Sequence, residues 1–168
     1  GEHAVAFQKL FPEIIWQTSE PEFIYRKSIS AWIYEEGLFK KMPQPLNIDV
    51  EKKPWPLSQK LRDDLRAIVC INLLHISPWQ CTYELFEEAS NYLYKEGMLI
   101  LYGPFKENGK HTSKSNEIFD LSLMSQNHQW GIRDLNDIRQ LSLTKGFVYS
   151  DLIQMPANNL LLVFQMAK

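Results

Sequence analysis

The sequence predicts an α/β protein whose doubly wound, mostly parallel sheet ends in an antiparallel hairpin. Two unbroken apolar runs, residues 67–71 and 98–101, suit strands covered on both faces, as in a parallel sheet. Helical patterns alternate with these runs, which specifies right-handed crossovers. The last two strand-type runs, 147–155 and 160–165, are only four residues apart, so they must pair antiparallel.

The amino-terminal part reads as two helices and two short strands. Apolar residues share one face of a short helix over 3–10, and residues 14–16 form a brief apolar strand. A capped helix follows and runs to Glu36. Residues 46, 48 and 50 are apolar and alternate with polar residues, which predicts a further strand over 46–50.

The strand over 67–71 is the one around which the predicted fold is organised. Leucines spaced four apart predict a short helix over 57–65 just before it. Ser77 and Pro78 read as the capped start of the helix that follows it. The apolar face of that helix holds Cys81, Leu85, Ala89 and Leu93.

A polar, glycine-containing connection of about 30 residues, 103–133, follows the strand over 98–101. Connections of that length are usually functional or partly structured, so this one is a candidate cover for a ligand crevice. Asp134 then caps a helix that Gly146 closes.

Composition predicts a single domain over residues 1–168, because 168 residues that are 45% hydrophobic can bury one sizeable core. No apolar run approaches the roughly 20 residues of a membrane span, and no secretory signal opens the chain, which favours a cytoplasmic protein. A net charge of −2 argues against binding duplex nucleic acid. Cys70 and Cys81 read as reduced packing residues, and the histidines and cysteines show no metal-ligand spacing.

Polar residues stand where the predicted strands end, and ligands of open α/β sheets bind at the carboxyl ends of strands. Glu20 follows one strand, Asp49 ends another, and Asn72 and His75 follow a third. A carboxylate at Glu20 can accept hydrogen bonds from ribose hydroxyls, although it also suits a helix amino terminus. Asp49 reads equally well as a turn residue.

Four runs carry a family resemblance: VCINLLHISPW, LYGPFKENGKHTSKSNEIFD, WGIRDLNDI and MPANNLLLVF. Together they resemble the methyltransferase-like 26 family, and the sheet with its terminal hairpin resembles the Rossmann-like fold of class I methyltransferases that use S-adenosylmethionine. The resemblance covers essentially the whole chain. It implies S-adenosylmethionine as cofactor and a small-molecule acceptor, whose identity does not follow from the fold.

The resemblance also implies a strand and a glycine-rich turn before the first helix. Gly1, Glu2 and His3 look like the tail of that turn, so the domain reads as incomplete at its amino terminus. We therefore expect further residues before Gly1 in the natural protein. An intact mass equal to the 19.7 kDa of this sequence would contradict that expectation.

The implied cofactor contacts lie at the strand ends, with Asp49 facing the adenine amino group. They are Gly1, His3, Glu20, Asp49, Val50, Asn72 and Leu73. Methyl transfer needs in-line approach and exclusion of water more than a strong base, so no single catalytic residue is mandatory. The candidate catalytic residues are His75, Tyr102 and His111. His75 can remove an acceptor proton, or it can simply organise its loop.

Three lysines and a histidine within nine residues, 106–114, can bind an anionic acceptor such as a carboxylate or phosphate. The simpler interpretation is a loop whose lysines face water. Arg133 can pair with the acceptor or with Asp134. Candidate acceptor-binding residues are Lys106, Lys110, Asn116, Arg133 and Asn158; Asn158 also suits a tight turn.

The leading functional hypothesis is a methyltransferase that moves a methyl group from S-adenosylmethionine to a small molecule. A second hypothesis is a cofactor-fold protein that no longer catalyses and serves as a binding or scaffold module. A third, a nicotinamide-dependent oxidoreductase, is disfavoured by the terminal hairpin and the four runs. Formation of S-adenosylhomocysteine separates the first hypothesis from the second.

Overall fold

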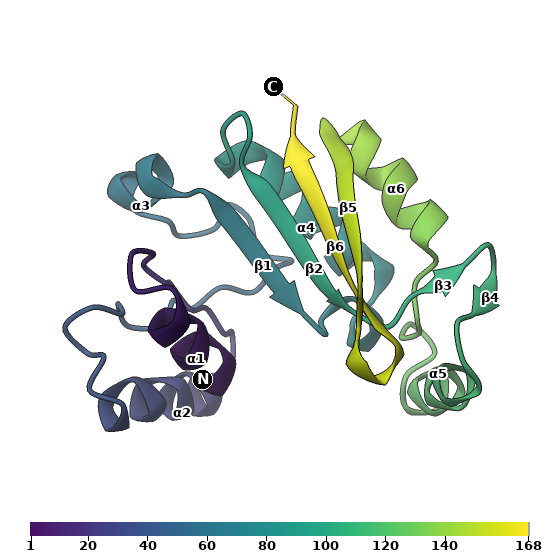
Figure 1. Cartoon of the computed structure of the whole chain (residues 1–168), viewed down its shortest axis with the longest axis horizontal. Coiled ribbons are helices and arrows are strands. Elements are labelled where there is room, and N and C mark those ends of the chain that lie inside the picture. Colours follow the sequence, from purple (N-terminus) through teal and green to yellow (C-terminus); the bar gives the residue numbers. More distant parts are fainter. Residues whose placement is uncertain (168) are drawn as a thin grey trace. The chain divides into compact units, whose positions relative to one another are not determined.

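A four-stranded mixed sheet organises the carboxyl-terminal two thirds of the chain in the computed structural model, which describes residues 1–167 (Figure 1). Its strands lie in the order β1-β2-β6-β5. β1 and β2 are parallel, whereas β6 runs antiparallel to both β2 and β5. The bounds are β1 (Ala67–Ile71), β2 (Met98–Gly103), β5 (Phe147–Met155) and β6 (Asn159–Met166). The predicted α/β class with its terminal hairpin is confirmed.

The chain divides into a first unit, Gly1–Pro56, and a second unit that begins at Leu57. The single-domain interpretation of residues 1–168 stays a prediction. Among residues 1–167, no helix is long and apolar enough to cross a bilayer.

Helices α4 (Trp79–Tyr92) and α6 (Leu135–Thr144) cover one face of the sheet, behind it in Figure 1. The core on this side centres on Phe86, whose ring centroid lies 5.3 Å from Phe164 and 5.7 Å from Phe147. The predicted apolar face of α4 is buried, as expected. A short helix, α3 (Gln59–Asp64), precedes β1.

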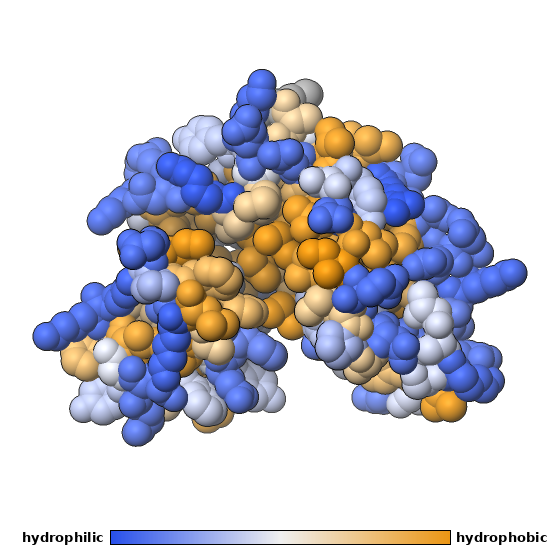
Figure 2. All heavy atoms as spheres, viewed as in Figure 1, coloured by the Kyte–Doolittle hydropathy of each residue, from blue (hydrophilic) through white to orange (hydrophobic). Residues whose placement is uncertain are grey.

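The other face of the sheet is only partly covered, which differs from the expectation of strands buried on both sides. Burial alternates along β2, where Leu99 and Leu101 are buried while Ile100 is half-buried. Ile100 lies in a cross-strand row with Val69 and Val163, which are also half-buried. Figure 2 shows apolar atoms gathered over this face.

The first unit is built from two helices, α1 (Glu2–Leu10) and α2 (Phe23–Glu35). They approach each other closely at Gly1, where an added Cβ would lie 2.9 Å from the Cα of Ile29. Only glycine fits such a backbone contact. The buried core of the unit is Val5, Ile29, Ile33 and Met42.

The prediction of two strands in the first unit, over 14–16 and 46–50, is wrong. A single parallel bridge joins Leu46 to Ser19, which lies outside the strand predicted at 14–16. At 14–16 the buried amide of Gln8 explains the difference, because its Nε2 donates to the carbonyl of Ile14 (2.6 Å) and its Oε1 accepts from the backbone N–H of Trp16 (3.1 Å). Backbone N–H and C=O groups that already hydrogen-bond to a side chain do not require a neighbouring strand as a hydrogen-bond partner.

The long connection after β2 is partly structured, as its length predicted. It forms a small hairpin, β3 (Lys106–Glu107) and β4 (Lys110–His111), followed by α5 (Lys114–Gln126). Ser113 caps α5 by accepting a hydrogen bond from the backbone N–H of Asn116 (3.1 Å). The sequence patterns had not predicted this helix, whose apolar residues are spread around its axis.

The two predicted helix caps of the second unit differ in outcome. The cap by Ser77 is wrong: its hydroxyl donates to the carbonyl of Leu73 (2.9 Å), and α4 begins after Pro78 with no side-chain cap. Between β1 and α4 the chain forms a short 3₁₀ turn, η1 (Leu74–Ile76). The cap of α6 by Asp134 is confirmed by a 2.8 Å hydrogen bond from the backbone N–H of Asn136.

Candidate functional site

Polar residues gather at the carboxyl ends of the parallel strands β1 and β2, in the second unit. The backbone N–H of Asn72 donates to the carbonyl of Tyr102 (2.9 Å), which ties the two strand ends together. The side chain of Asn159, at the start of β6, donates to the Tyr102 hydroxyl (3.1 Å). We call this edge, formed by Asn72, Tyr102, Asn158 and Asn159, the crest.

Helix α5 is fastened to the crest through Asn116, which is 5% exposed. Its Nδ2 donates to the backbone carbonyl of Asn158 (3.1 Å) and to the hydroxyl of Thr112 (3.0 Å). Both amide hydrogens are therefore used within the protein. The structure places the predicted acceptor-binding residues Asn116 and Asn158 together, and it gives Asn116 a structural role there.

The backbone is left-handed at two crest residues, Asn72 (φ 59°) and Asn158 (φ 58°), and at Ala157 (φ 57°) just before Asn158. Asparagine tolerates this region better than other non-glycine residues, whereas alanine is strained in it. The turn role of Asn158 is thus confirmed. Non-glycine residues in this region cluster at ligand and active sites, which draws attention to the same edge of the sheet.

His75 lies buried below the crest, with 5% of its surface exposed. Its ring packs edge-on against Phe119, with centroids 5.5 Å apart, and its carbonyl accepts the backbone N–H of Gly131 (3.0 Å). Burial, assisted by the charge of Arg133, lowers the pKa of His75 to about 4. The ring is therefore neutral near pH 7, and its contacts favour the interpretation that it organises the loop.

This burial predicts a pH dependence of stability. Because the folded pKa of about 4 lies below the ordinary 6.5, the unfolded chain binds the proton first, and stability falls as pH drops from 6.5 towards 4. That gap corresponds to about 3 kcal/mol, which solvent screening reduces to about 2. Urea unfolding of His75→Gln between about pH 7 and pH 4 should lack this component. A variant with the same pH slope as wild type would contradict the assignment.

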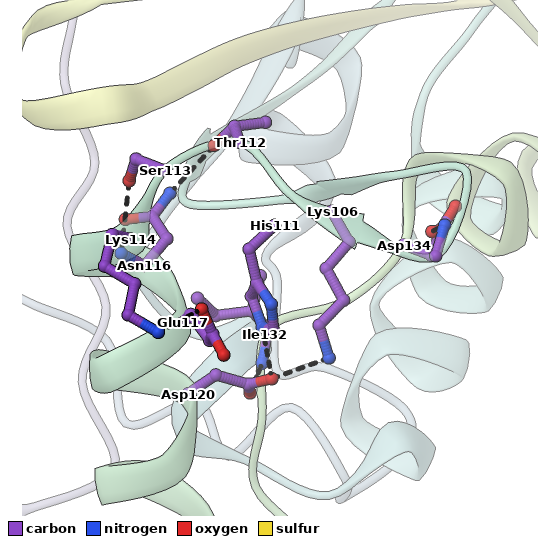
Figure 3. A network of polar contacts seen from close by, with 11 residues as sticks. Lys106, His111, Thr112, Ser113, Lys114, Asn116, Glu117, Asp120, Ile132 and Asp134 are labelled. Carbon is purple, nitrogen blue, oxygen red and sulfur yellow. Dashed lines mark hydrogen bonds and ion pairs between the residues drawn. The ribbon is translucent and has the colours of Figure 1, made fainter.

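A buried carboxylate, Asp120, joins three segments of the long connection (Figure 3). Its Oδ2 accepts from Lys106 Nζ (2.6 Å) and His111 Nε2 (2.8 Å), and its Oδ1 accepts the backbone N–H of Ile132 (2.6 Å). Burial raises the pKa of Asp120, but these hydrogen bonds outweigh burial and hold it below its ordinary value. Asp120 is 1% exposed and ionised.

Sequence reasoning missed Asp120. The signal that could have found it is its spacing from Asn116, because residues four apart share one face of a helix. Since α5 was not predicted, that spacing carried no meaning. The predicted catalytic residue His111 is now seen with its Nε2 held by Asp120.

Two further cations of this region, Arg133 and Lys114, also have partners within the protein. Arg133 donates from Nε to the carbonyl of Leu74 (2.9 Å) and from Nη2 to the carbonyls of Ser77 and Gln129. The alternative that Arg133 pairs with Asp134 is wrong, because Asp134 accepts backbone N–H groups instead. Lys114 Nζ lies 2.8 Å from Glu117 on the surface of α5.

An open depression of about 550 Å³ lies beside this network. The two cations in its wall are already paired, since Lys106 binds Asp120 and Arg133 binds backbone carbonyls. The depression therefore offers a ligand no unpaired cation among its lining residues, whereas Asp137 is an exposed carboxylate in the wall. Its lining residues are Trp79, Lys106, Gly109, Ile132, Arg133, Asp134, Asn136 and Asp137.

Comparison with known families assigns the chain. A family model described as "Protein of unknown function (DUF938)" matches residues 1–166. The chain belongs to the DUF938 family. No more specific family is established by that match.

Solved structures similar to this DUF938 chain show its fold. An O-methyltransferase family 2 protein from Planctomyces limnophilus, solved with apigenin, has a TM-score of 0.76 and 19% identity over 97% of this chain and 46% of that chain. Human N-acetylserotonin methyltransferase, solved with SAM, has a TM-score of 0.73 and 12% identity over 96% and 43%. The DUF938 chain thus has the class I methyltransferase-like fold and spans under half the length of these proteins.

The carboxylates predicted to hold the cofactor lie in the first unit of the DUF938 chain. Oε1 of Glu20 accepts the backbone N–H of Glu22 (2.9 Å) at the start of α2, which leaves Oε2 for a ligand hydroxyl. Asp49 accepts the backbone N–H of Glu51 (3.2 Å) and pairs with Lys52 (3.1 Å), as a turn residue does. The free carboxylate oxygen of Glu20 can accept a hydrogen bond from a ribose hydroxyl, whereas the carboxylate of Asp49 already has two partners.

The other predicted cofactor residues are distributed over both units. Gly1 and His3 open α1, and Val50 follows Asp49 in the same half-buried turn. In the second unit, the side chain of Asn72 is exposed at the crest and Leu73 is half-buried beside it. An exposed amide at a strand end fits a polar end of a cofactor.

Proposed function

We propose that this DUF938 protein transfers a methyl group from S-adenosylmethionine to a small-molecule acceptor. The observation that carries the proposal is the crest: polar groups from β1, β2 and the β5–β6 hairpin meet at the carboxyl ends of the parallel strands. Ligands of open α/β sheets bind at that edge. The fold and the resemblance of four runs to the methyltransferase-like 26 family support the same function.

The residues proposed to hold the cofactor are those named from the sequence. Glu20 accepts hydrogen bonds from the ribose hydroxyls, and Asp49 accepts one from the adenine amino group. Asn72 and Leu73 contact the methionine end of the cofactor. The other residues of the proposed cofactor site are Gly1, His3 and Val50. When bound, the cofactor supplies an electrophilic methyl group on a sulfonium sulfur.

The crest orients the acceptor in this proposal. The Tyr102 hydroxyl accepts a hydrogen bond from Asn159, so its own hydrogen is available to donate to an acceptor oxygen. Because Asp120 is ionised, His111 donates to it from Nε2, and Nδ1 is then the ring atom able to take a proton. His75, buried and neutral, supports the loop from below.

Glu20→Ala is expected to weaken binding of S-adenosylhomocysteine about 10- to 100-fold, because hydrogen bonds to a charged group contribute about 1.5–3 kcal/mol. Isothermal titration calorimetry on the full-length protein measures this. The exposed neighbour Glu22 gives the matched control, Glu22→Gln, which should bind like wild type. Equal affinity of wild type and Glu20→Ala would remove Glu20 from the cofactor site.

Product formation tests the reaction. We expect the full-length protein to convert S-adenosylmethionine into S-adenosylhomocysteine when incubated with a deproteinised metabolite extract. Binding without turnover would favour the second candidate function, a cofactor-fold binding module. A protein described as a pericyclic reaction enzyme has a similar fold (TM-score 0.76, 14% identity), so the fold alone does not determine the reaction.

A further inference from the structure

We propose that the methyl acceptor is an uncharged molecule whose polar group is bound by Tyr102 and Asn72. The inference rests on the proposed methyltransferase function and specifies its substrate class. It is an alternative to one of the two interpretations of the three lysines and the histidine within nine residues, namely that they bind an anionic acceptor.

The two half-buried cations near the crest are held by partners within the protein: Lys106 is bound to Asp120, and the guanidinium of Arg133 to three backbone carbonyls. Removing Lys106 or Arg133 from these partners would leave buried polar groups unpaired, which is costly. Lys114 forms only an exposed ion pair with Glu117 on the surface of α5, where water screens its charge. Lys110 is exposed in the β3–β4 hairpin, where water screens its charge.

The polar groups facing outward at the crest are neutral. They are the exposed amide of Asn72 and the hydroxyl of Tyr102, which Asn159 orients. His75 below them carries no charge near pH 7, because burial lowers its pKa to about 4. The negative charge of Asp120 is balanced by Lys106.

Charged and uncharged acceptors differ in how much hydration free energy they lose on binding. A charged acceptor loses its hydration when it enters the site, and it needs an opposite charge to compensate for that loss. The crest provides none among the described residues. A hydroxyl or amide loses much less hydration, and Tyr102 and Asn72 replace its water hydrogen bonds.

The methyl transfer is balanced for such an acceptor. A lone pair of an acceptor hydroxyl forms the new carbon–oxygen bond while the methyl carbon–sulfur bond breaks, and its electron pair stays on sulfur. The acceptor oxygen gives its proton to water. A neutral acceptor and the cationic methyl donor thus yield three products: the acceptor with an uncharged methyl ether, the former donor with an uncharged thioether, and one proton.

Ion-exchange fractionation tests the charge of the acceptor. A deproteinised metabolite extract is separated at neutral pH into anionic, cationic and unretained fractions, and each is incubated with the full-length protein and S-adenosylmethionine labelled in its methyl group. We expect label to enter the unretained fraction. Label in a retained fraction overturns the inference while leaving the methyltransferase function intact, and label in none overturns both.

Two kinetic measurements with the fraction that accepts the label test the proposal further. Tyr102→Phe should lower kcat/KM about tenfold, the effect of one hydrogen bond, while Tyr94→Phe, an exposed tyrosine before β2, should not change it. KM should stay constant as salt is raised from about 0.1 M to about 1 M, because a neutral acceptor is not screened. A KM that rises steeply with salt, or full activity of Tyr102→Phe, contradicts the proposal.

Discussion

Asp120→Ala is expected to destabilise the second unit by about 3–5 kcal/mol, the cost of breaking a buried charge pair by removing one partner. The substitution leaves Lys106, His111 and the backbone N–H of Ile132 without the acceptor they share. Because these donors come from β3, β4 and the segment after α5, the long connection loses the group that holds it together. Urea unfolding measured by tryptophan fluorescence gives the change.

A matched control is Glu117→Ala, an acid on the same helix that is also paired with a lysine. Its partner Lys114 is largely exposed, and exposed ion pairs contribute little. The urea midpoint of Glu117→Ala should therefore match wild type. If both variants unfold at the same urea concentration, Asp120 is not the central group of the network.

The pH dependence of Asp120 adds a second signature. Its folded pKa lies below the ordinary value, so the stability it contributes is present above about pH 4 and is lost as pH falls through the folded pKa. In Asp120→Ala, this loss of unfolding free energy at acid pH should be absent. In Glu117→Ala, which keeps Asp120, it should remain.

Phe86→Ala is expected to cost about 3–5 kcal/mol, the usual range for removing a buried aromatic ring. Phe86 is 0% exposed and lies edge-on to Phe147 and Phe164 at 5.7 and 5.3 Å. The variant leaves a cavity between α4 and the β5–β6 hairpin. Thermal unfolding followed by circular dichroism measures the loss.

The control for Phe86 is Tyr94→Ala, an aromatic truncation at a position that is 58% exposed. Surface substitutions of this kind usually change stability by no more than about 0.5 kcal/mol. A loss at Tyr94 equal to that at Phe86 would show that the packing between α4 and the hairpin is not what stabilises the sheet.

The second unit could be predicted well because its signals are local. A four-residue link forces β5 and β6 into an antiparallel pair, and the spacing of Cys81, Leu85 and Ala89 defines the buried face of α4. Each of these depends on residues close together in the chain. The strand expected at 14–16 failed because the buried side chain of Gln8 satisfies backbone groups there, and side-chain partners of this kind carry no periodic pattern. The strand expected at 46–50 pairs only at Leu46 and then enters a turn, in which the backbone N–H of Lys52 donates to the carbonyl of Asp49.

The site was predicted in outline, since Asn72, Tyr102 and Asn158 were named from their places at strand ends and a turn. Its electrostatics could not be predicted in the same way. Lys106 reads as a free cation in the sequence, and only the fold reveals that Asp120, fourteen positions later, neutralises it. Charge pairing between segments depends on tertiary contacts, so the sequence left two interpretations of these lysines open: a loop whose lysines face water, and a loop that binds an anionic acceptor.

We propose that Glu20, Asp49 and Asn72 bind one adenosyl ligand. An NMR titration of the full-length, ¹⁵N-labelled protein with S-adenosylhomocysteine tests this proposal. The backbone amide resonances of all three residues should shift and saturate at the same ligand concentration. Resonances that stay in place, or shifts confined to one of the three, would contradict it.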